Sequence, residues 1–210
     1  MSIKLQLMPK TLSKISDTGL LYIHLPKCGG TSIKKALLPD FNFPSGHYSA
    51  NAYKVALGNK RYKELKSFSV VRNPWDRAVS AYFYVMDKQR DSSSPNAYYR
   101  DNIFSRYTTF EEFVMSYLGG GETLKLNHTI PQWQFLCDTN GELIVDTIIK
   151  LEELNEGFEK LGDLSGLYFQ FTIENKSNRS KDYKSYYTED MKKVIGDVYA
   201  RDIEEFGYEF

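Results

Sequence analysis

The sequence predicts an α/β fold of three layers, in which a central parallel β-sheet of about four or five strands is flanked by helices. Two observations predict it. Short apolar runs, typical of buried parallel strands, alternate with helical patterns along the chain, and two of the runs lead through a loop directly into a helix. A length of 210 residues fits a single domain, expected over residues 1–210, with residues 1–18 as an N-terminal extension.

The first strand–loop–helix unit contains a glycine loop. Residues 20–25 form the apolar run, residues 26–32 read PKCGGTS, and a helical pattern follows until Pro39. Backbone N–H groups at such a loop, with a neighbouring lysine, favour an anion site. The lysine precedes the glycines, unlike the lysine of a standard ATPase loop. The alternative is a tight turn in which Thr31 or Ser32 only caps the helix. The candidate anion ligands are Lys27, Cys28, Gly29, Gly30, Thr31 and Ser32.

The second unit places Arg72 after the apolar run 67–71 and Ser80 two turns into a helix expected over residues 75–86, with Pro74 in its first turn. Ligands of parallel sheets bind at the carboxyl ends of the strands. Arg72 and Ser80 are therefore candidates for holding a phosphate. The alternative is that Arg72 pairs with a nearby aspartate, Asp76 or Asp87, and that Ser80 is a small packing residue.

Further elements follow from local patterns. Residues 87–107 are polar and predict a surface loop, which is a candidate for contacting an acceptor substrate. Thr109 and Glu112 have capping-box spacing. The remaining expected elements are helices over residues 50–57, 109–118, 151–161 and 188–206, and a strand over residues 143–149.

Composition excludes several classes of function. Lys and Arg total 27, as do Asp and Glu, so the chain lacks the positive field of a general nucleic-acid binder. The two cysteines match no disulfide or metal-site spacing, which favours a reducing compartment. Neither a signal-peptide pattern nor an apolar run of about 18 residues occurs. These observations predict a soluble cytoplasmic protein without a membrane span.

Together the two units resemble the sulfotransferases. Residues 22–32, YIHLPKCGGTS, are similar to the 5′-phosphosulfate loop of that family, and residues 70–84, VVRNPWDRAVSAYFY, to its 3′-phosphate segment. Weaker similarity to the carbohydrate branch continues at residues 150–154, 178–187 and 202–208. The resemblance implies a P-loop-like fold and an O-sulfotransferase that uses 3′-phosphoadenosine 5′-phosphosulfate (PAPS) and releases 3′-phosphoadenosine 5′-phosphate (PAP).

The resemblance also implies roles for individual residues. Lys27 would contact the bridging oxygen and offset charge on the leaving phosphate, while Arg72 and Ser80 would hold the 3′-phosphate. Arg179 is a further candidate for that phosphate, with a solvated basic loop as the alternative. No metal is expected, because a sulfuryl group bears less negative charge than a phosphoryl group and the sequence shows no carboxylates spaced to hold magnesium.

A histidine is the expected general base, since its pKa lies nearest to neutral pH. His47 is favoured because it falls between the two donor motifs, where many family members place a histidine base. His128 is the rival, and a solvated loop histidine is the alternative for His47. His24, beside the loop, is interpreted as structural.

The acceptor is expected to be a hydroxyl, on a carbohydrate or on a small molecule. Tyr98, Arg100 and His128 are candidate acceptor-binding residues, because rings stack on sugar faces and arginines meet acidic groups. Two alternatives from other classes remain. One is a P-loop nucleotide kinase, and the other is a catalytically silent module that binds PAP or PAPS.

Overall fold

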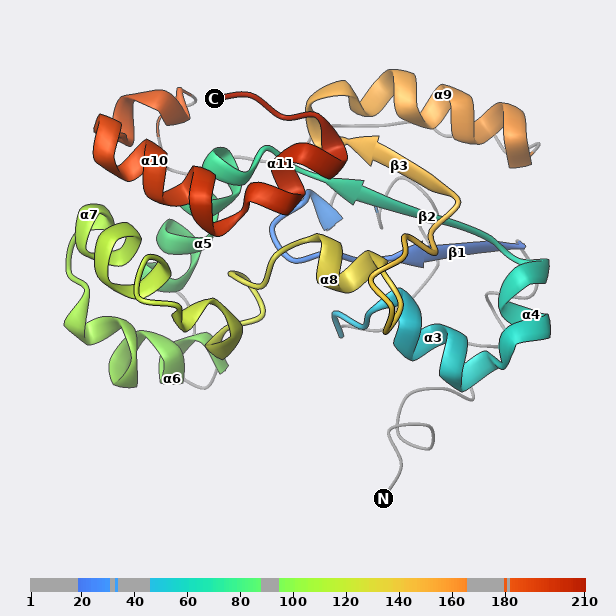
Figure 1. Cartoon of the computed structure of the whole chain (residues 1–210), viewed down its shortest axis with the longest axis horizontal. Coiled ribbons are helices and arrows are strands. Elements are labelled where there is room, and N and C mark those ends of the chain that lie inside the picture. The colour runs from blue at the N-terminus through green and yellow to red at the C-terminus, as the bar shows by residue number, and fades with distance from the viewer. Residues whose placement is uncertain (1–18, 31–32, 34–45, 88–94, 166–179, 181) are drawn as a thin grey trace. The chain divides into compact units, whose positions relative to one another are not determined.

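The computed structural model describes residues 19–30, 33, 46–87, 95–165, 180 and 182–210 (Figure 1). The chain divides into two compact units, which are treated separately below. The sheet unit comprises residues 1–71 and 132–175, and the helical unit comprises residues 72–131 and 176–210. The elements of the sheet unit are β1 (Leu20–Ile23), α3 (Ala50–Leu57), α4 (Asn59–Glu64), β2 (Lys66–Val71), α8 (Trp133–Leu136), β3 (Thr147–Lys150) and α9 (Leu154–Ser165). Those of the helical unit are α5 (Pro74–Met86), α6 (Pro95–Asn102), α7 (Phe110–Glu112), α10 (Glu189–Val198) and α11 (Ala200–Phe206).

The sheet is parallel throughout, in the order β1-β2-β3. Leu20 lies opposite Lys66 in the first pair of strands, and Phe68 lies opposite Thr147 in the second. The residues that the structure describes contain three strands, fewer than the four or five expected. The α/β class with a parallel sheet is nevertheless confirmed.

The third strand is shorter than its apolar run predicts. Leu143 forms an isolated antiparallel bridge with Cys137, across a turn in which the Asp138 carboxylate accepts the Asn140 N–H at 2.9 Å. The strand itself begins at Thr147. The residue before it, Asp146, accepts the backbone N–H of Ser67 with its carboxylate at 2.8 Å. The first half of residues 143–149 therefore belongs to a hairpin turn rather than to the sheet.

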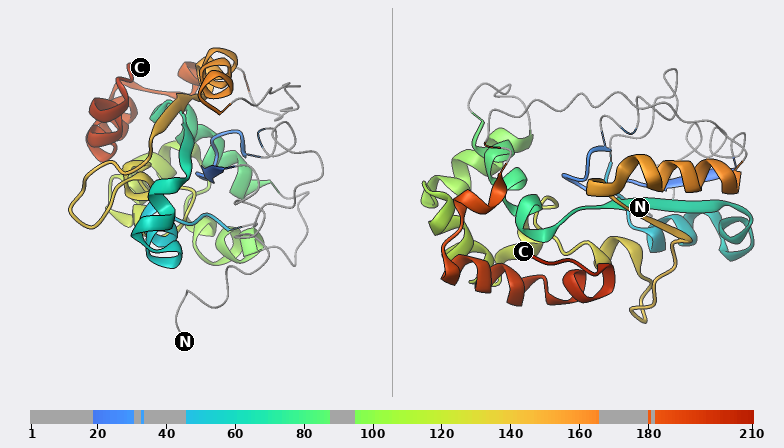
Figure 2. Two further views of the ribbon diagram at one scale, coloured as in Figure 1. Left: turned by 90° about the vertical axis from the view of Figure 1, so that its right-hand side faces the viewer. Right: turned by 90° about the horizontal axis from the view of Figure 1, so that it is seen from above.

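Helices lie on both sides of the three strands in the sheet unit. The strands run between α9 on one side and the pair α3 and α4 on the other, as the front and side views agree (Figures 1 and 2). α9 approaches β3 closely at Gly157, where any Cβ would overlap the Ile149 side chain. The expected helix over residues 50–57 is observed as α3.

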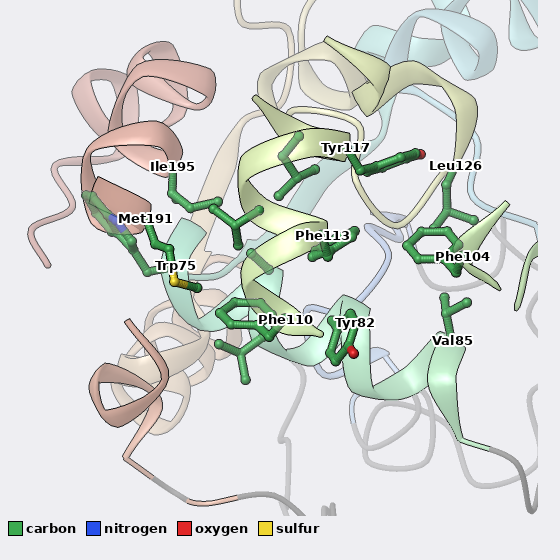
Figure 3. Packing of buried hydrophobic residues seen from close by; sticks show 14 of the residues in the cluster. Trp75, Tyr82, Val85, Phe104, Phe110, Phe113, Tyr117, Leu126, Met191 and Ile195 are labelled. Atoms are coloured by element: carbon green, nitrogen blue, oxygen red, sulfur yellow. The ribbon is translucent and has the colours of Figure 1, made fainter. Parts of the chain in front are cut away.

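The helical unit is built on α5, which begins with Pro74 at its first turn as predicted. Its inner face packs into a core of aromatic and aliphatic side chains, many of them from α7, the turns after it and α10 (Figure 3). Phe113 and Tyr117 stack with ring centroids 5.4 Å apart, and both are fully buried. Much of the unusual aromatic content of the chain is used here as core.

The prediction of a surface loop over residues 87–107 is wrong for its described part. Residues 95–102 form α6, and residues 104–106 form a 3-10 helix. Ala97 and Phe104 are buried, with the Phe104 ring 5.0 Å from that of Tyr117. A polar sequence forms helix here because these two side chains anchor it to the core.

The last expected helix, over residues 188–206, is two helices. α10 begins after the N-cap Thr188 and ends at Val198, and Tyr199 separates it from α11, which starts at Ala200. The Tyr199 hydroxyl donates to the buried carbonyl oxygen of Thr129 at 2.7 Å, which holds the break in place. No helix in the described part of the chain is long and apolar enough to cross a membrane.

The predicted capping box is present at the start of α7. Thr109 Oγ1 accepts the N–H of Glu112, whose carboxylate accepts the Thr109 N–H in return, both at 3.1 Å. The carboxylate also accepts from Thr108, and these hydrogen bonds lower the pKa of Glu112. Residues 113–118 continue as a π-helical turn rather than as α-helix.

Thr109→Ala is expected to lower the free energy of unfolding by about 1 kcal/mol, because it removes the oxygen that accepts the Glu112 N–H. The measurement is urea denaturation followed by circular dichroism. Ser105→Ala is the control, since Ser105 is exposed nearby, and should change the value by less than about 0.5 kcal/mol. Equal effects of the two substitutions would contradict the role of the capping box.

Candidate functional site

The loop after β1 has a backbone shaped to gather N–H groups. Lys27 has φ +67° and Gly29 has φ +73°, while Cys28 and Gly30 between and after them do not have positive φ. Alternation in the sign of φ turns successive N–H groups into one concavity, the arrangement of an anion-binding nest. Lys27 adopts this conformation despite having a side chain. A helical turn begins at Gly30, where the Ile33 N–H donates to Gly29 O at 3.1 Å.

The Cys28 side chain points away from solvent. It is fully buried, and its Sγ lies 3.3 Å from Oε1 of Gln132, which is itself fully buried. The thiol donates to this oxygen, so the side chain fastens the loop to the start of the segment that contains α8. Tyr22 is also buried. Its burial, and to a smaller extent its electrostatic interaction with Cys28, raise the pKa of the Tyr22 phenol well above its usual value. Cys28 can serve an anion only through its backbone N–H.

His24 packs directly against the glycine loop. Gly30 lies so close to the His24 imidazole that a Cβ at position 30 would overlap the ring. Two aromatic rings also neighbour this imidazole. Its centroid is 5.6 Å from that of Tyr22 and 4.3 Å from that of His47. Glycine is required at position 30 because the imidazole takes the space of a side chain.

His47 lies beside this loop, in the sheet unit. Its Nδ1 is 3.1 Å from the backbone carbonyl oxygen of His24. Since a carbonyl oxygen only accepts hydrogen bonds, Nδ1 must carry the proton in this contact, which leaves Nε2 of a neutral His47 as the basic nitrogen. The arrangement can therefore accept a proton at a defined atom next to the loop.

The segment that carries His47 is held by the start of α3. Ser49 is the N-cap of that helix, and its side chain accepts the Ala52 N–H at 3.2 Å. Tyr48 packs edge-on against Tyr53 with centroids 6.3 Å apart, and its ring fills the space that a Cβ at Gly46 would need. A cap and a ring contact thus fix the backbone on both sides of His47.

In the helical unit, Arg72 is paired with Asp76. Nε and Nη2 of Arg72 donate to the same carboxylate oxygen, at 2.8 and 2.6 Å, with both side chains largely shielded from solvent. The ion pair that the sequence left open as an alternative is therefore present. It holds the guanidinium at the first turn of α5, because Asp76 lies in that turn.

Ser80 lies on the one face of α5 that is not buried. Asp76, Ser80 and Tyr84 are spaced by four residues and are all partly exposed, so they form one stripe along the helix. The His128 ring packs edge-on against that of Tyr84, with centroids 5.0 Å apart. His128 therefore lies one turn beyond Ser80, in the helical unit, whereas His47 lies with Lys27 in the sheet unit.

The two other acceptor candidates lie on α6. Tyr98 is exposed and meets Tyr99 edge-on, with centroids 5.9 Å apart. Arg100 Nε donates to the Asp101 carboxylate at 2.8 Å, and that hydrogen bond raises the pKa of Arg100 and lowers that of Asp101. The Arg100 guanidinium is thus already engaged by an acid on its own helix.

Thr31, Ser32 and Arg179 lie outside the described residues. Among the described ones, no group of three or more histidine, cysteine and acidic side chains is arranged to hold a metal ion. Two residues with structural roles were not predicted. In the sheet unit, Gln132 accepts the hydrogen bond of the Cys28 thiol, and in the helical unit, Asn73 caps α5. Asn73 before Pro74 was a detectable N-cap signal, while the contact of Gln132 joins positions too distant to predict.

Comparison with known proteins gives one match. A family model described as "Sulfotransferase family" matches residues 15–209. No curated protein matches the chain. No solved structure matches it either. The matched range includes both the glycine loop and the segment of Arg72 and Ser80.

Gly30→Ala is expected to displace the His24 imidazole and, through the ring contact and the carbonyl bond, His47 as well. Proton NMR of the imidazole C–H signals should show both histidines shifted, while His128, in the other unit, keeps its signal. Gly196→Ala is the control, because an added methyl group there meets Trp75 at an ordinary 3.8 Å. Unchanged His24 and His47 signals in Gly30→Ala would refute the contact.

Proposed function

The chain belongs to the sulfotransferase family, and on that premise we propose that it transfers a sulfuryl group from PAPS to an acceptor hydroxyl by in-line displacement. The acceptor oxygen forms a bond to sulfur, the bond between sulfur and the bridging oxygen of the donor breaks, and PAP leaves with that oxygen. The acceptor's proton passes to a base. The observation that carries this proposal is the alternating backbone at Lys27–Gly30, with a lysine inside it.

The glycine loop is suited to the 5′-phosphosulfate. A backbone of alternating φ would direct N–H donors at one point, and Lys27 would add the positive charge that a leaving phosphate oxygen requires. The loop is preorganised, because the Cys28 thiol and the His24 ring already fix its backbone. Little reorganisation is then needed when charge develops on the leaving group.

Arg72 and Ser80 are proposed to hold the 3′-phosphate, the group that distinguishes PAPS from ATP. The guanidinium is positioned by Asp76, and Ser80 supplies a hydroxyl from the partly exposed stripe of α5. An arginine held by a carboxylate loses less side-chain freedom when a phosphate binds, which supports this assignment. Arg179 is proposed as a further ligand of the same phosphate.

His47 is proposed as the general base. The carbonyl oxygen of His24 holds its Nδ1–H, so Nε2 is the atom that would take the acceptor's proton. The proximity of His47 to the loop with Lys27 also supports this choice, because both lie in one compact unit. His128 packs against Tyr84 and is proposed as an acceptor-binding residue instead.

A carbohydrate hydroxyl is the proposed acceptor. The support is the resemblance of the later motifs to the carbohydrate branch and the exposed Tyr98 ring, which is suited to stacking on a sugar face. Arg100, which pairs with Asp101 on the same helix, is proposed as a second acceptor-binding residue.

Thermal unfolding with PAP should test the donor site. PAP at 100 times its Kd adds about 2.7 kcal/mol to the stability of the folded state. For a chain of this size the unfolding midpoint should rise by roughly 5–10 °C. We expect Arg72→Ala to lose most of that rise, and Arg106→Ala, which removes an exposed arginine of the same unit, to keep it.

Stabilisation only by ATP with magnesium would contradict the donor assignment and favour a nucleotide kinase. Strong stabilisation by PAP without transfer from PAPS to any compound in a broad panel of hydroxyl acceptors would instead indicate a silent binding module.

Lys27→Ala and His47→Ala should each reduce turnover by about 100-fold or more, because one loses leaving-group stabilisation and the other the base. Only Lys27→Ala should also weaken PAP binding markedly. The measurement is PAP released from PAPS with methyl glycosides as acceptors, together with calorimetric titration of PAP. Full activity in His47→Ala with loss in His128→Ala would show that the base has been misassigned.

A further inference from the structure

The last two residues of the chain pack on the first turn of α5 in the helical unit. The Asn73 side-chain amide donates to the backbone oxygen of Glu209 at 2.8 Å. The Phe210 ring meets the Trp75 indole edge-on, with centroids 5.6 Å apart. These contacts join the end of the chain to the helix start that follows Arg72.

Phe210 is also the centre of a larger cluster. Its ring meets those of Tyr183 and Tyr187 edge-on, at centroid separations of 5.9 and 5.6 Å. The ammonium groups of Lys184 and Lys192 lie 5.3 and 4.6 Å from its centroid, within the range of a cation–π contact. We call Trp75, Tyr183, Tyr187 and Phe210 the aromatic anchor.

Hydrogen bonds tie the aromatic anchor to the backbone of α5 and α10. The Tyr187 hydroxyl donates to the Trp75 carbonyl oxygen at 2.8 Å, and the Trp75 indole N–H donates to the Lys192 carbonyl oxygen at 3.0 Å. The Lys184 ammonium donates to the Phe210 backbone oxygen at 3.0 Å. A ring held from this many directions has little freedom, so the position of Phe210 is closely defined.

Asn73 connects the aromatic anchor to Arg72. Its Oδ1 accepts the N–H groups of Trp75 and Asp76, which caps α5, while its Nδ2 donates to Glu209. The cap orders the turn that contains Asp76, and Asp76 in turn receives two hydrogen bonds from the Arg72 guanidinium. A connection thus runs from Phe210, through the backbone of its neighbour Glu209, to Asn73, and from Asn73 through Asp76 to Arg72.

We propose that Phe210 is a positioning residue for recognition of a ribose 3′-phosphate, acting through Asn73 and Asp76 on the Arg72 guanidinium. The proposal rests on the proposed function, in which Arg72 binds that phosphate. Phe210 itself does not touch the ligand. Its effect should therefore appear only with ligands that carry the 3′-phosphate.

The experiment compares PAP with adenosine 5′-monophosphate (AMP), which differs from PAP only in lacking the 3′-phosphate. Calorimetric titration of the full chain gives the Kd for each. We expect Phe210→Ala to weaken PAP binding about tenfold and to leave AMP binding unchanged. Phe210→Tyr retains the ring and should restore PAP binding to the wild-type value.

A matched control separates positioning from loss of stability. Phe158 is a buried ring of the sheet unit that meets Phe68 edge-on, and Phe158→Leu should destabilise the chain without changing the preference for PAP over AMP. Asn73→Ser is the second variant, needed if Phe210→Ala does not fold. Serine retains an oxygen that caps the helix but lacks the amide donor to Glu209, so the same selective loss is expected.

Several results would overturn the proposal. One is unchanged PAP binding in Phe210→Ala, or in Asn73→Ser if Phe210→Ala does not fold. Another is a loss of AMP binding equal to the loss of PAP binding. The third is PAP binding in Phe210→Tyr that remains as weak as in Phe210→Ala. In the double variant, the losses from Phe210→Ala and Asn73→Ser should not add, because both break one connection, and full additivity would count against it. A wild-type chain that binds AMP as tightly as PAP would show instead that the proposed function has failed.

Discussion

The backbone of the turn after β1 is the constraint on which the arrangement of Lys27, His24 and His47 in the sheet unit depends. Lys27 holds a left-handed conformation that costs a residue with a side chain roughly 1–2 kcal/mol. Such strain persists only where the surroundings over-determine it. The buried Cys28 thiol, bonded to Gln132, and the close contact of Gly30 with His24 provide that determination.

The same turn also explains why His24 and His47 lie together. His24 is the first residue after β1, so its carbonyl oxygen is placed by the end of the strand, and this oxygen fixes the protonated nitrogen of His47. Its imidazole fills the space beside Gly30. One residue thereby links the shape of the glycine loop, through its ring, to the orientation of the His47 imidazole, through its backbone.

Features encoded by adjacent residues were predictable from the sequence. The glycine loop, the Pro74 start of α5 and the capping box at Thr109 depend on neighbours along the chain, and each is observed. Phe104, by contrast, looked like part of a polar loop, because its burial against Tyr117 comes from a distant segment.

The break at Tyr199 has the same origin, since helical spacing continues through it while the Tyr199 side chain bonds to Thr129, far away in the sequence. The candidate site shows the same difference between features set by neighbouring residues and features set by distant ones. Lys27 and Arg72 could be proposed as site residues from local motifs, but the ring contact of His24 with His47 could not, because residues that far apart in the chain show no pattern that joins them. Asp76 was one of two nearby aspartates, with Asp87, that the sequence offered as a partner for Arg72, and the structure shows the pair with Asp76.

The close packing of His24 on Gly30 makes these two positions interdependent in any change of sequence. A side chain at position 30 requires the imidazole at position 24 either to move or to be replaced by a smaller side chain, so a change at one position favours a change at the other. A redesigned loop that pairs alanine at 30 with a smaller residue at 24 would lose the ring that flanks His47. The residues that the loop can carry at position 30 are therefore limited by His24, the neighbour of His47.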